Sequence, residues 1–133
     1  MHAIEEKFFK IIIVDENVQF RNTLASKLRI EGFHVEFATG GFHLLHVLEK
    51  HWDFNLIVLH ENMIDMSAEE MVTHVRSHMT KTELPILFIS SNSSEDEICE
   101  MIFNGANEYI VKTANYQPIV ERAKKYFTLL KNS

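Results

Sequence analysis

Short apolar runs rich in β-branched residues, spaced regularly along the chain, most constrain what this sequence can fold into. The clearest are residues 11–14 (Ile-Ile-Ile-Val), 56–59 (Leu-Ile-Val-Leu) and 86–89 (Ile-Leu-Phe-Ile). These runs are continuous rather than alternating, which is typical of strands covered on both faces in a parallel sheet. Residues 34–38 alternate and are expected to form an edge strand. Residues 109–111 are short and complete a set of five strands.

The segments between these runs have helical spacing. Phe20, Leu24 and Leu28 recur every four residues, which places them on one face of a helix. Ser67 and Ser94 each precede a glutamate by three residues, a capping-box pattern that predicts the start of a helix. Five strands alternating with five helices imply right-handed crossovers and an α/β fold with a doubly wound parallel sheet.

Length and charge limit the kind of protein this can be. With 133 residues, we expect a single domain over residues 1–133, with its core at about residues 10–130. The net charge of −6 argues against nucleic acid as a partner, because phosphate binding needs a basic surface. No apolar run approaches a membrane span, and a lone thiol, Cys99, suits a reducing compartment. We therefore expect a cytoplasmic protein with neither nucleic acid nor membrane as partner.

Polar residues stand where the central strands are predicted to end. Asp15 and Glu16 follow the first strand, His60 follows the third, Ser90 the fourth and Lys112 the fifth. In a doubly wound sheet these ends lie along one edge, and ligands bind at that edge. An acid pair, an imidazole, a hydroxyl and an ammonium group converging there predict a functional site.

Several motifs together carry a resemblance to a known family. Residues 14–17 (Val-Asp-Glu-Asn), 55–59 (Asn-Leu-Ile-Val-Leu) and 104–112 (Asn-Gly-Ala-Asn-Glu-Tyr-Ile-Val-Lys) have the order and spacing of a receiver domain. The chain resembles the receiver domains of bacterial two-component response regulators, the CheY-like family, over residues 10–130. The resemblance implies a flavodoxin-like sheet with strand order 2-1-3-4-5.

The resemblance also implies roles for particular residues. In the family, an acidic pair binds magnesium together with an acceptor aspartate and the backbone carbonyl two residues later. Asp15, Glu16 and Asn62 match the pair and the carbonyl position. Ser90 and Lys112 match the hydroxyl and the lysine that hold the phosphoryl group.

The pattern departs from the family at His60, which stands at the phosphoacceptor position. Histidine lacks the carboxylate nucleophile, and neutral imidazole is a poor ligand for magnesium. We therefore expect no cofactor and at most a weak divalent metal site. We interpret His60 as a strand-end histidine hydrogen-bonded to Asp15 or Glu16, and we expect Lys112 to pair with the same acids. Glu61 is expected to point away from the pocket, because neighbouring residues of a strand alternate in direction.

The interpretation that follows is a pseudo-receiver: a non-enzymatic signalling or scaffolding module of a two-component pathway or phosphorelay, independent of phosphorylation. The resemblance implies a protein partner on the helix after Ser94, the last strand and the last helix. Tyr109 matches the aromatic that reorients in the family, Phe103 is expected to be exposed nearby, and a homodimer is a further option.

Two alternatives stay open. One is a phosphorylated receiver that uses a non-standard acceptor, His60 or Asp65. The other is a small flavodoxin-like cofactor binder. That class needs a glycine- or hydroxyl-rich phosphate loop after the first strand, where this chain has acids.

Overall fold

The structure, a computed structural model, describes residues 4–61 and 63–133, over which five strands and five α-helices alternate. The strands are β1 (Lys10–Val14), β2 (His34–Ala38), β3 (Leu56–His60), β4 (Ile86–Ser90) and β5 (Glu108–Val111). The helices are α1 (Val18–Ile30), α2 (Gly41–Lys50), α3 (Ala68–Arg76), α4 (Glu95–Asn104) and α5 (Gln117–Lys131). A short 3-10 helix, Glu6–Phe8, precedes β1. Within the described ranges, no helix is both long and apolar enough to cross a membrane.

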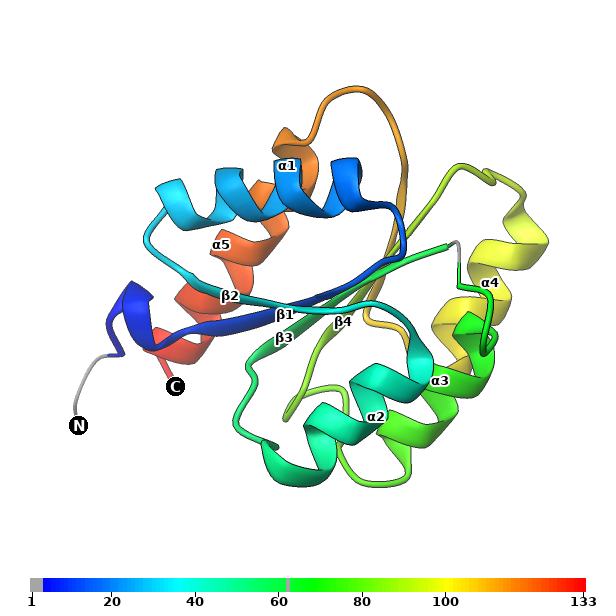
Figure 1. Ribbon diagram of the computed structural model, residues 1–133, viewed down its shortest axis with the longest axis horizontal. Helices are drawn as coiled ribbons and strands as arrows, with labels where there is room; N and C mark the ends of the chain where they lie inside the picture. Colours follow the sequence, from blue (N-terminus) through cyan, green and yellow to red (C-terminus); the bar gives the residue numbers. More distant parts are fainter. Residues whose placement is uncertain (1–3, 62) are drawn as a thin grey trace.

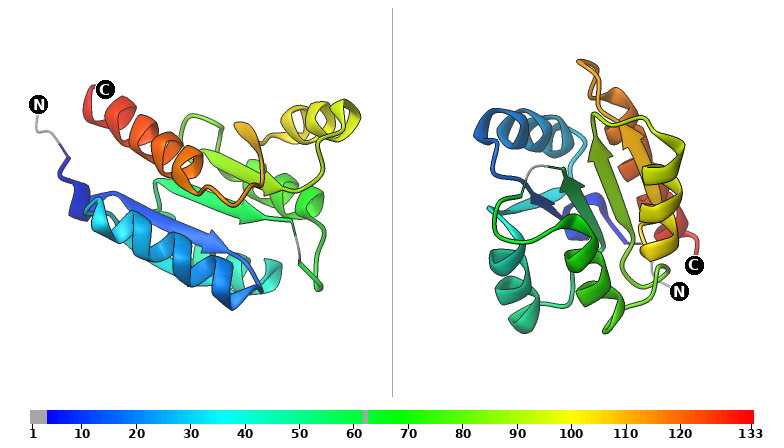
Figure 2. Two further views of the ribbon diagram at one scale, coloured as in Figure 1. Left: turned by 90° about the horizontal axis from the view of Figure 1, so that it is seen from above. Right: turned by 90° about the vertical axis from the view of Figure 1, so that its right-hand side faces the viewer.

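The strands form one parallel sheet in the order β2-β1-β3-β4-β5, as predicted. The alternating segment β2 lies at an edge of this sheet, which confirms its predicted place. Helices α1 and α5 cover one face, and α2, α3 and α4 cover the other (Figure 1). Because all strand arrows point the same way (Figure 2), the carboxyl ends of the strands lie along one edge of the sheet.

The continuous apolar runs are explained by two hydrophobic cores, one on each face of the sheet. In β1, Ile11 and Ile13 pack into the core beneath α1 and α5, whereas Ile12 and Val14 pack into the core against α2, α3 and α4. Every residue of β3 and β4 is buried. A strand that is buried on both faces has no position for a solvent-facing polar residue, so its sequence does not alternate.

The helices begin where side chains can satisfy their free backbone N–H groups. The Ser67 hydroxyl accepts from Glu70 N at 3.1 Å and the Ser94 hydroxyl from Glu97 N at 3.3 Å, which confirms both predicted helix starts. Helix α2 is capped from a distant loop instead. The Asp65 carboxylate accepts from the backbone N–H groups of the first two α2 residues, at 3.1 and 3.0 Å.

Candidate functional site

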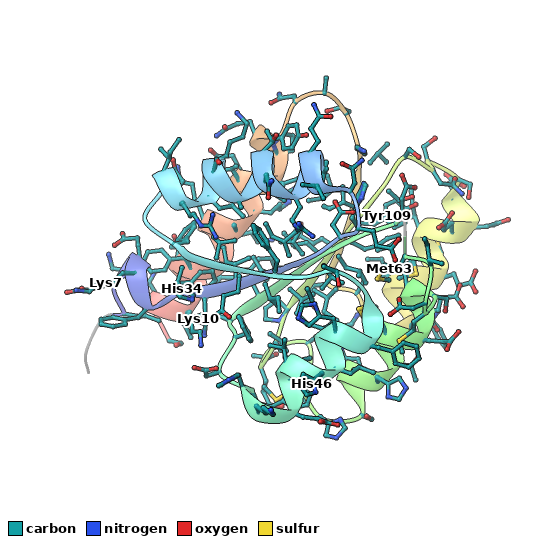
Figure 3. The ribbon with its side chains drawn as sticks, in the orientation of Figure 1. Lys7, Lys10, His34, His46, Met63 and Tyr109 are labelled. Atoms are coloured by element: carbon teal, nitrogen blue, oxygen red, sulfur yellow. The ribbon has the colours of Figure 1, made fainter. Side chains whose placement is uncertain are left out.

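The carboxyl edge of the sheet holds an unusual set of buried polar side chains. Among the described residues, the buried polar or charged residues are Asp15, His60 and Ser90, and all three lie at this edge. Figure 3 shows Tyr109 and Met63 near the same end of the molecule, with Lys10 and His34 at the opposite end. Burying polar groups is costly, so these side chains mark the carboxyl edge as the candidate functional site, the edge where the polar strand ends were expected to converge.

His60, at the end of β3, is fixed on two sides. Its Nδ1 lies 3.1 Å from Asp15 Oδ1, and both side chains are fully buried. An ionised carboxylate can only accept, so the imidazole Nδ1 carries the hydrogen. The imidazole ring stacks on Phe20 of α1, with ring centroids 4.3 Å apart and planes 10° apart. The predicted hydrogen bond from His60 to one of the two acids is therefore made to Asp15.

The two acids after β1 are already engaged. Besides His60, Asp15 Oδ1 accepts the backbone N–H of Asn17 at 2.9 Å. Glu16 Oε1 accepts the backbone N–H of Ile64 at 2.8 Å, which ties the loop after β1 to the loop after β3. Asp15 Oδ2 and His60 Nε2 are buried and have no hydrogen-bond partner within residues 4–61 and 63–133.

Magnesium does not fit the donor set that the described residues present. Magnesium prefers an octahedral shell of oxygen ligands. Here the acceptor position offers the ring nitrogens of His60, and Glu16 Oε1 is bound to a loop N–H. Asp15 Oδ2 is the one Asp15 oxygen without a partner among these residues. Asn62, the remaining predicted ligand, lies outside the described residues.

Glu61 points into the site, so the prediction that it faces away is wrong. Its Oε2 accepts from the Ser90 hydroxyl at 2.7 Å and from Ser91 N at 3.0 Å, and its Oε1 accepts from the Ser91 hydroxyl at 2.9 Å. Strand β3 ends at His60, so the alternation of strand neighbours does not extend to Glu61. Burial opposes ionisation of the carboxyl, but the hydrogen bonds from Ser90 and Ser91 prevail and lower the pKa of Glu61.

Lys112 does not pair with the acids, contrary to the prediction. No ion pair joins it to Asp15 or Glu16 among the described residues, and its Nζ lies 4.8 Å from the centroid of the Phe20 ring. Phe20 thus contacts both the imidazole of His60 and the ammonium group of Lys112. The sequence indicated Phe20 only as a core residue of α1. Its contacts with His60 and Lys112 depend on how α1 packs on the sheet, which helical spacing does not specify.

Of the two predicted partner-surface residues, Tyr109 contacts the loop after β4, whereas Phe103 lies near the C-terminal end of α4. Tyr109, on β5, donates from its hydroxyl to the backbone carbonyl of Asn92 at 2.7 Å, and its ring packs edge-on against Phe88. Burial raises the pKa of the Tyr109 hydroxyl. Phe103, on α4, is 90% exposed, which confirms its expected exposure.

Asp65, the other acceptor considered, is engaged elsewhere. Both of its carboxylate oxygens cap α2, through the backbone N–H groups of Gly41 and Phe42. The hydrogen bond from Phe42 is the main cause that lowers the pKa of Asp65. The structure therefore places Asp65 at the start of α2 rather than in contact with Ser90.

Comparison with known proteins gives consistent matches. The sequence model of the response regulator receiver domain matches residues 11–124. The chain is 32% identical over 131 residues to the chemotaxis protein CheY-3 of Vibrio cholerae, covering 98% of this chain and 100% of that protein. It is 30% identical over 119 residues to the chemotaxis protein CheY of Pseudomonas aeruginosa, covering 89% of this chain and 95% of that protein.

Solved structures agree with this assignment. The chemotaxis response regulator CheY4 of Vibrio cholerae superposes with a TM-score of 0.81 at 26% identity, over 90% of this chain and 98% of that chain. A probable two-component system response regulator/GGDEF domain protein gives a TM-score of 0.86 over 94% of this chain and 51% of that chain. At 20% identity, the second similarity concerns the fold alone. The cofactor-binding alternative is not favoured by these matches, and the chain belongs to the family of response regulator receiver domains.

Proposed function

We propose that this receiver domain works without phosphorylation, as a signalling or scaffolding module that acts through protein contacts in a two-component-type pathway. The observation that carries the proposal is the environment of His60. The family's acceptor position holds an imidazole that is fully buried, hydrogen-bonded to Asp15 and covered by Phe20. One ring nitrogen and one face of the imidazole are therefore already used in structural contacts.

Phosphoryl transfer would need three things at this edge: an accessible nucleophile, a cation and a pair of groups to hold the product. His60 Nε2 is buried, and too few free carboxylate oxygens remain among the described residues for the octahedral oxygen shell of magnesium. The Ser90 hydroxyl is already bound to Glu61, and the ammonium group of Lys112 rests on the Phe20 ring. We therefore propose that the domain is not an enzyme and has no resident cofactor.

The partner surface of this proposal comprises α4, β5 and α5. Phe103 supplies an exposed aromatic side chain on α4, and Tyr109 supplies a half-buried one on β5. Aromatic residues, phenylalanine and tyrosine among them, are enriched in the cores of protein interfaces. A homodimer through this surface would be one form of such contact.

Mass spectrometry of the intact protein after incubation with acetyl phosphate and magnesium tests this function. We expect no added phosphoryl mass, while a receiver with an aspartate acceptor, treated in parallel, becomes labelled. Stoichiometric labelling of the wild type would overturn the proposal. His60→Gln and Asp65→Asn would then assign the site, because each removes one of the two alternative acceptors.

A further inference from the structure

A carboxylate occupies the hydroxyl-lined end of the candidate site. Three donors converge on Glu61: the Ser90 hydroxyl at 2.7 Å, Ser91 N at 3.0 Å and the Ser91 hydroxyl at 2.9 Å. Hydrogen bonds to an ionised acceptor are about twice as strong as neutral ones. Glu61 comes from the loop after β3, and its donors come from the end of β4 and the residue after it, so the contact joins two neighbouring strand ends.

The same cluster continues to Tyr109. The Ser90 hydroxyl, which donates to Glu61, also accepts the backbone N–H of Asn92 at 3.1 Å. The carbonyl of Asn92 in turn accepts the Tyr109 hydroxyl at 2.7 Å. The position of the Asn92 backbone, and with it the hydrogen bond of Tyr109, therefore depends on the Ser90 hydroxyl, whose hydrogen is donated to Glu61.

The connection also reaches the start of α4. The Asn92 side-chain oxygen accepts Ser94 N at 2.9 Å, and its side-chain nitrogen donates to Glu97 in the first turn of the helix. Residues 91–94 thus form a loop that is fixed at one end by Glu61 and at the other by the cap of α4. The proposed partner surface begins at this cap and includes Tyr109.

We propose that Glu61 is a built-in anion of this receiver: its carboxylate holds the β4–α4 loop and thereby keeps Tyr109 bound to Asn92. Glu61 is then a positioning residue for the partner surface. This inference rests on the proposed function, since Glu61 supplies an internal carboxylate where a phosphorylated receiver would need an added phosphoryl group. On this proposal, the orientation of the Tyr109 side chain is determined by an intramolecular contact that is always present.

The test uses the full chain labelled with 3-fluorotyrosine and compares the wild type with Glu61→Ala by 19F NMR. The chain has three tyrosines, so Tyr116 and Tyr126 serve as internal references. We expect the Tyr109 signal to shift or broaden in Glu61→Ala while the two reference signals stay in place. The Ser91 amide should also exchange with solvent faster, by about tenfold or more, because it loses a hydrogen bond to a charged acceptor.

Glu69→Ala is the matched control, because Glu69 lines the cleft beside Glu61 but makes no hydrogen bond to Ser90 or Ser91 among the described contacts. Its Tyr109 signal should match the wild type. If Glu61→Ala proves unfolded, Glu61→Gln and Ser91→Ala provide the same comparison with smaller changes. An unchanged Tyr109 signal in the folded Glu61 variant would overturn the built-in anion and leave the proposed function standing. Phosphoryl labelling of the wild type would overturn the proposed function without bearing on this coupling.

Discussion

His60 and Asp15 form a buried pair in which each side chain provides a hydrogen-bond partner for the other. The imidazole donates to a carboxylate that has lost its contact with water, and the Phe20 ring covers one face of the imidazole. Removing one member of such a pair is costly, because the other is left buried without its partner. The pair therefore accounts for why a histidine at this position is compatible with a stable fold.

The first prediction concerns His60→Asp. Two buried carboxylates would then face each other, so we expect the free energy of unfolding without magnesium to fall by about 3–5 kcal/mol. Magnesium should restore part of this loss, because a bound cation stabilises the folded state by mass action. Urea denaturation with and without magnesium measures both effects. The wild type should show no magnesium dependence, and an equal stabilisation of wild type and variant would contradict the account.

The second prediction concerns the pH dependence of the Glu61 contact. Since the folded pKa of Glu61 lies below its ordinary value of 4.5, its contribution to stability is complete above that value and is lost as the pH falls through the folded pKa. The difference in unfolding free energy between wild type and Glu61→Gln should therefore shrink on acidification. Denaturant titrations at several acidic pH values measure it, and a difference that grows towards low pH would refute the contact.

At the scale of elements, Arg76 joins the end of α3 to the segment before β4 and to the turn between α4 and β5. Its guanidinium donates to the carbonyls of Gly105 at 2.8 Å and Leu84 at 2.9 Å, and to Asn107 Oδ1 at 2.8 Å. Gly105 ends α4 with φ at +128°, a conformation that L side chains rarely adopt, and a Cβ there would lie 2.7 Å from Arg76 Cγ. Nothing in the sequence analysis indicated the role of Arg76.

The third prediction follows from these contacts. Arg76→Ala should lower the free energy of unfolding by about 2–4 kcal/mol, because several carbonyls lose a charged donor together. Arg29→Ala is the control, since the exposed Arg29 makes a single described hydrogen bond, to the carbonyl of Val35. Its effect should stay below about 1 kcal/mol, as is usual for an exposed side chain. Equal losses from the two arginine variants would contradict this reading of Arg76.

Elements were more predictable from the sequence than the loops that join them. Strands buried on both faces must be apolar throughout, so β3 and β4 could be recognised from composition alone. The strand ends also placed Asp15, His60 and Ser90 together at one edge. The direction of Glu61 could not be predicted in this way, because it follows the last residue of β3, where hydrogen bonds with Ser91 rather than the pleat decide the side-chain direction.

For the whole molecule, the site lies at the carboxyl ends of the central strands, whereas the proposed partner surface comprises the edge strand β5 and the helices α4 and α5 on the two faces of the sheet. Figure 1 shows α4 and α5 on opposite faces of the sheet. The β4–α4 loop is the segment through which the site can influence this surface. Since its contacts with Glu61 need no added group, we expect the surface to be constitutively available to a partner.

The fourth prediction concerns that surface. In a pull-down that identifies a protein partner, Tyr109→Ala and Phe103→Ala should impair capture while leaving the circular dichroism spectrum unchanged. Phe103 is 90% exposed, so its loss should cost little stability. His60→Ala should affect capture only as far as it disturbs the acidic edge. If His60→Ala abolished capture and the two aromatic variants retained it, the strand-end site itself would be the binding site.

The most direct measurement of the central claim is a 1H–15N NMR titration of the wild-type protein with magnesium and beryllofluoride, a phosphoryl mimic. The backbone amides of Ser91, Tyr109 and Lys112 report on the strand ends and on the loop that Glu61 holds. The account predicts that these signals keep their positions throughout the titration, because the site neither binds the mimic nor needs it. Saturable shifts at these amides, dependent on magnesium and beryllofluoride together, would contradict it.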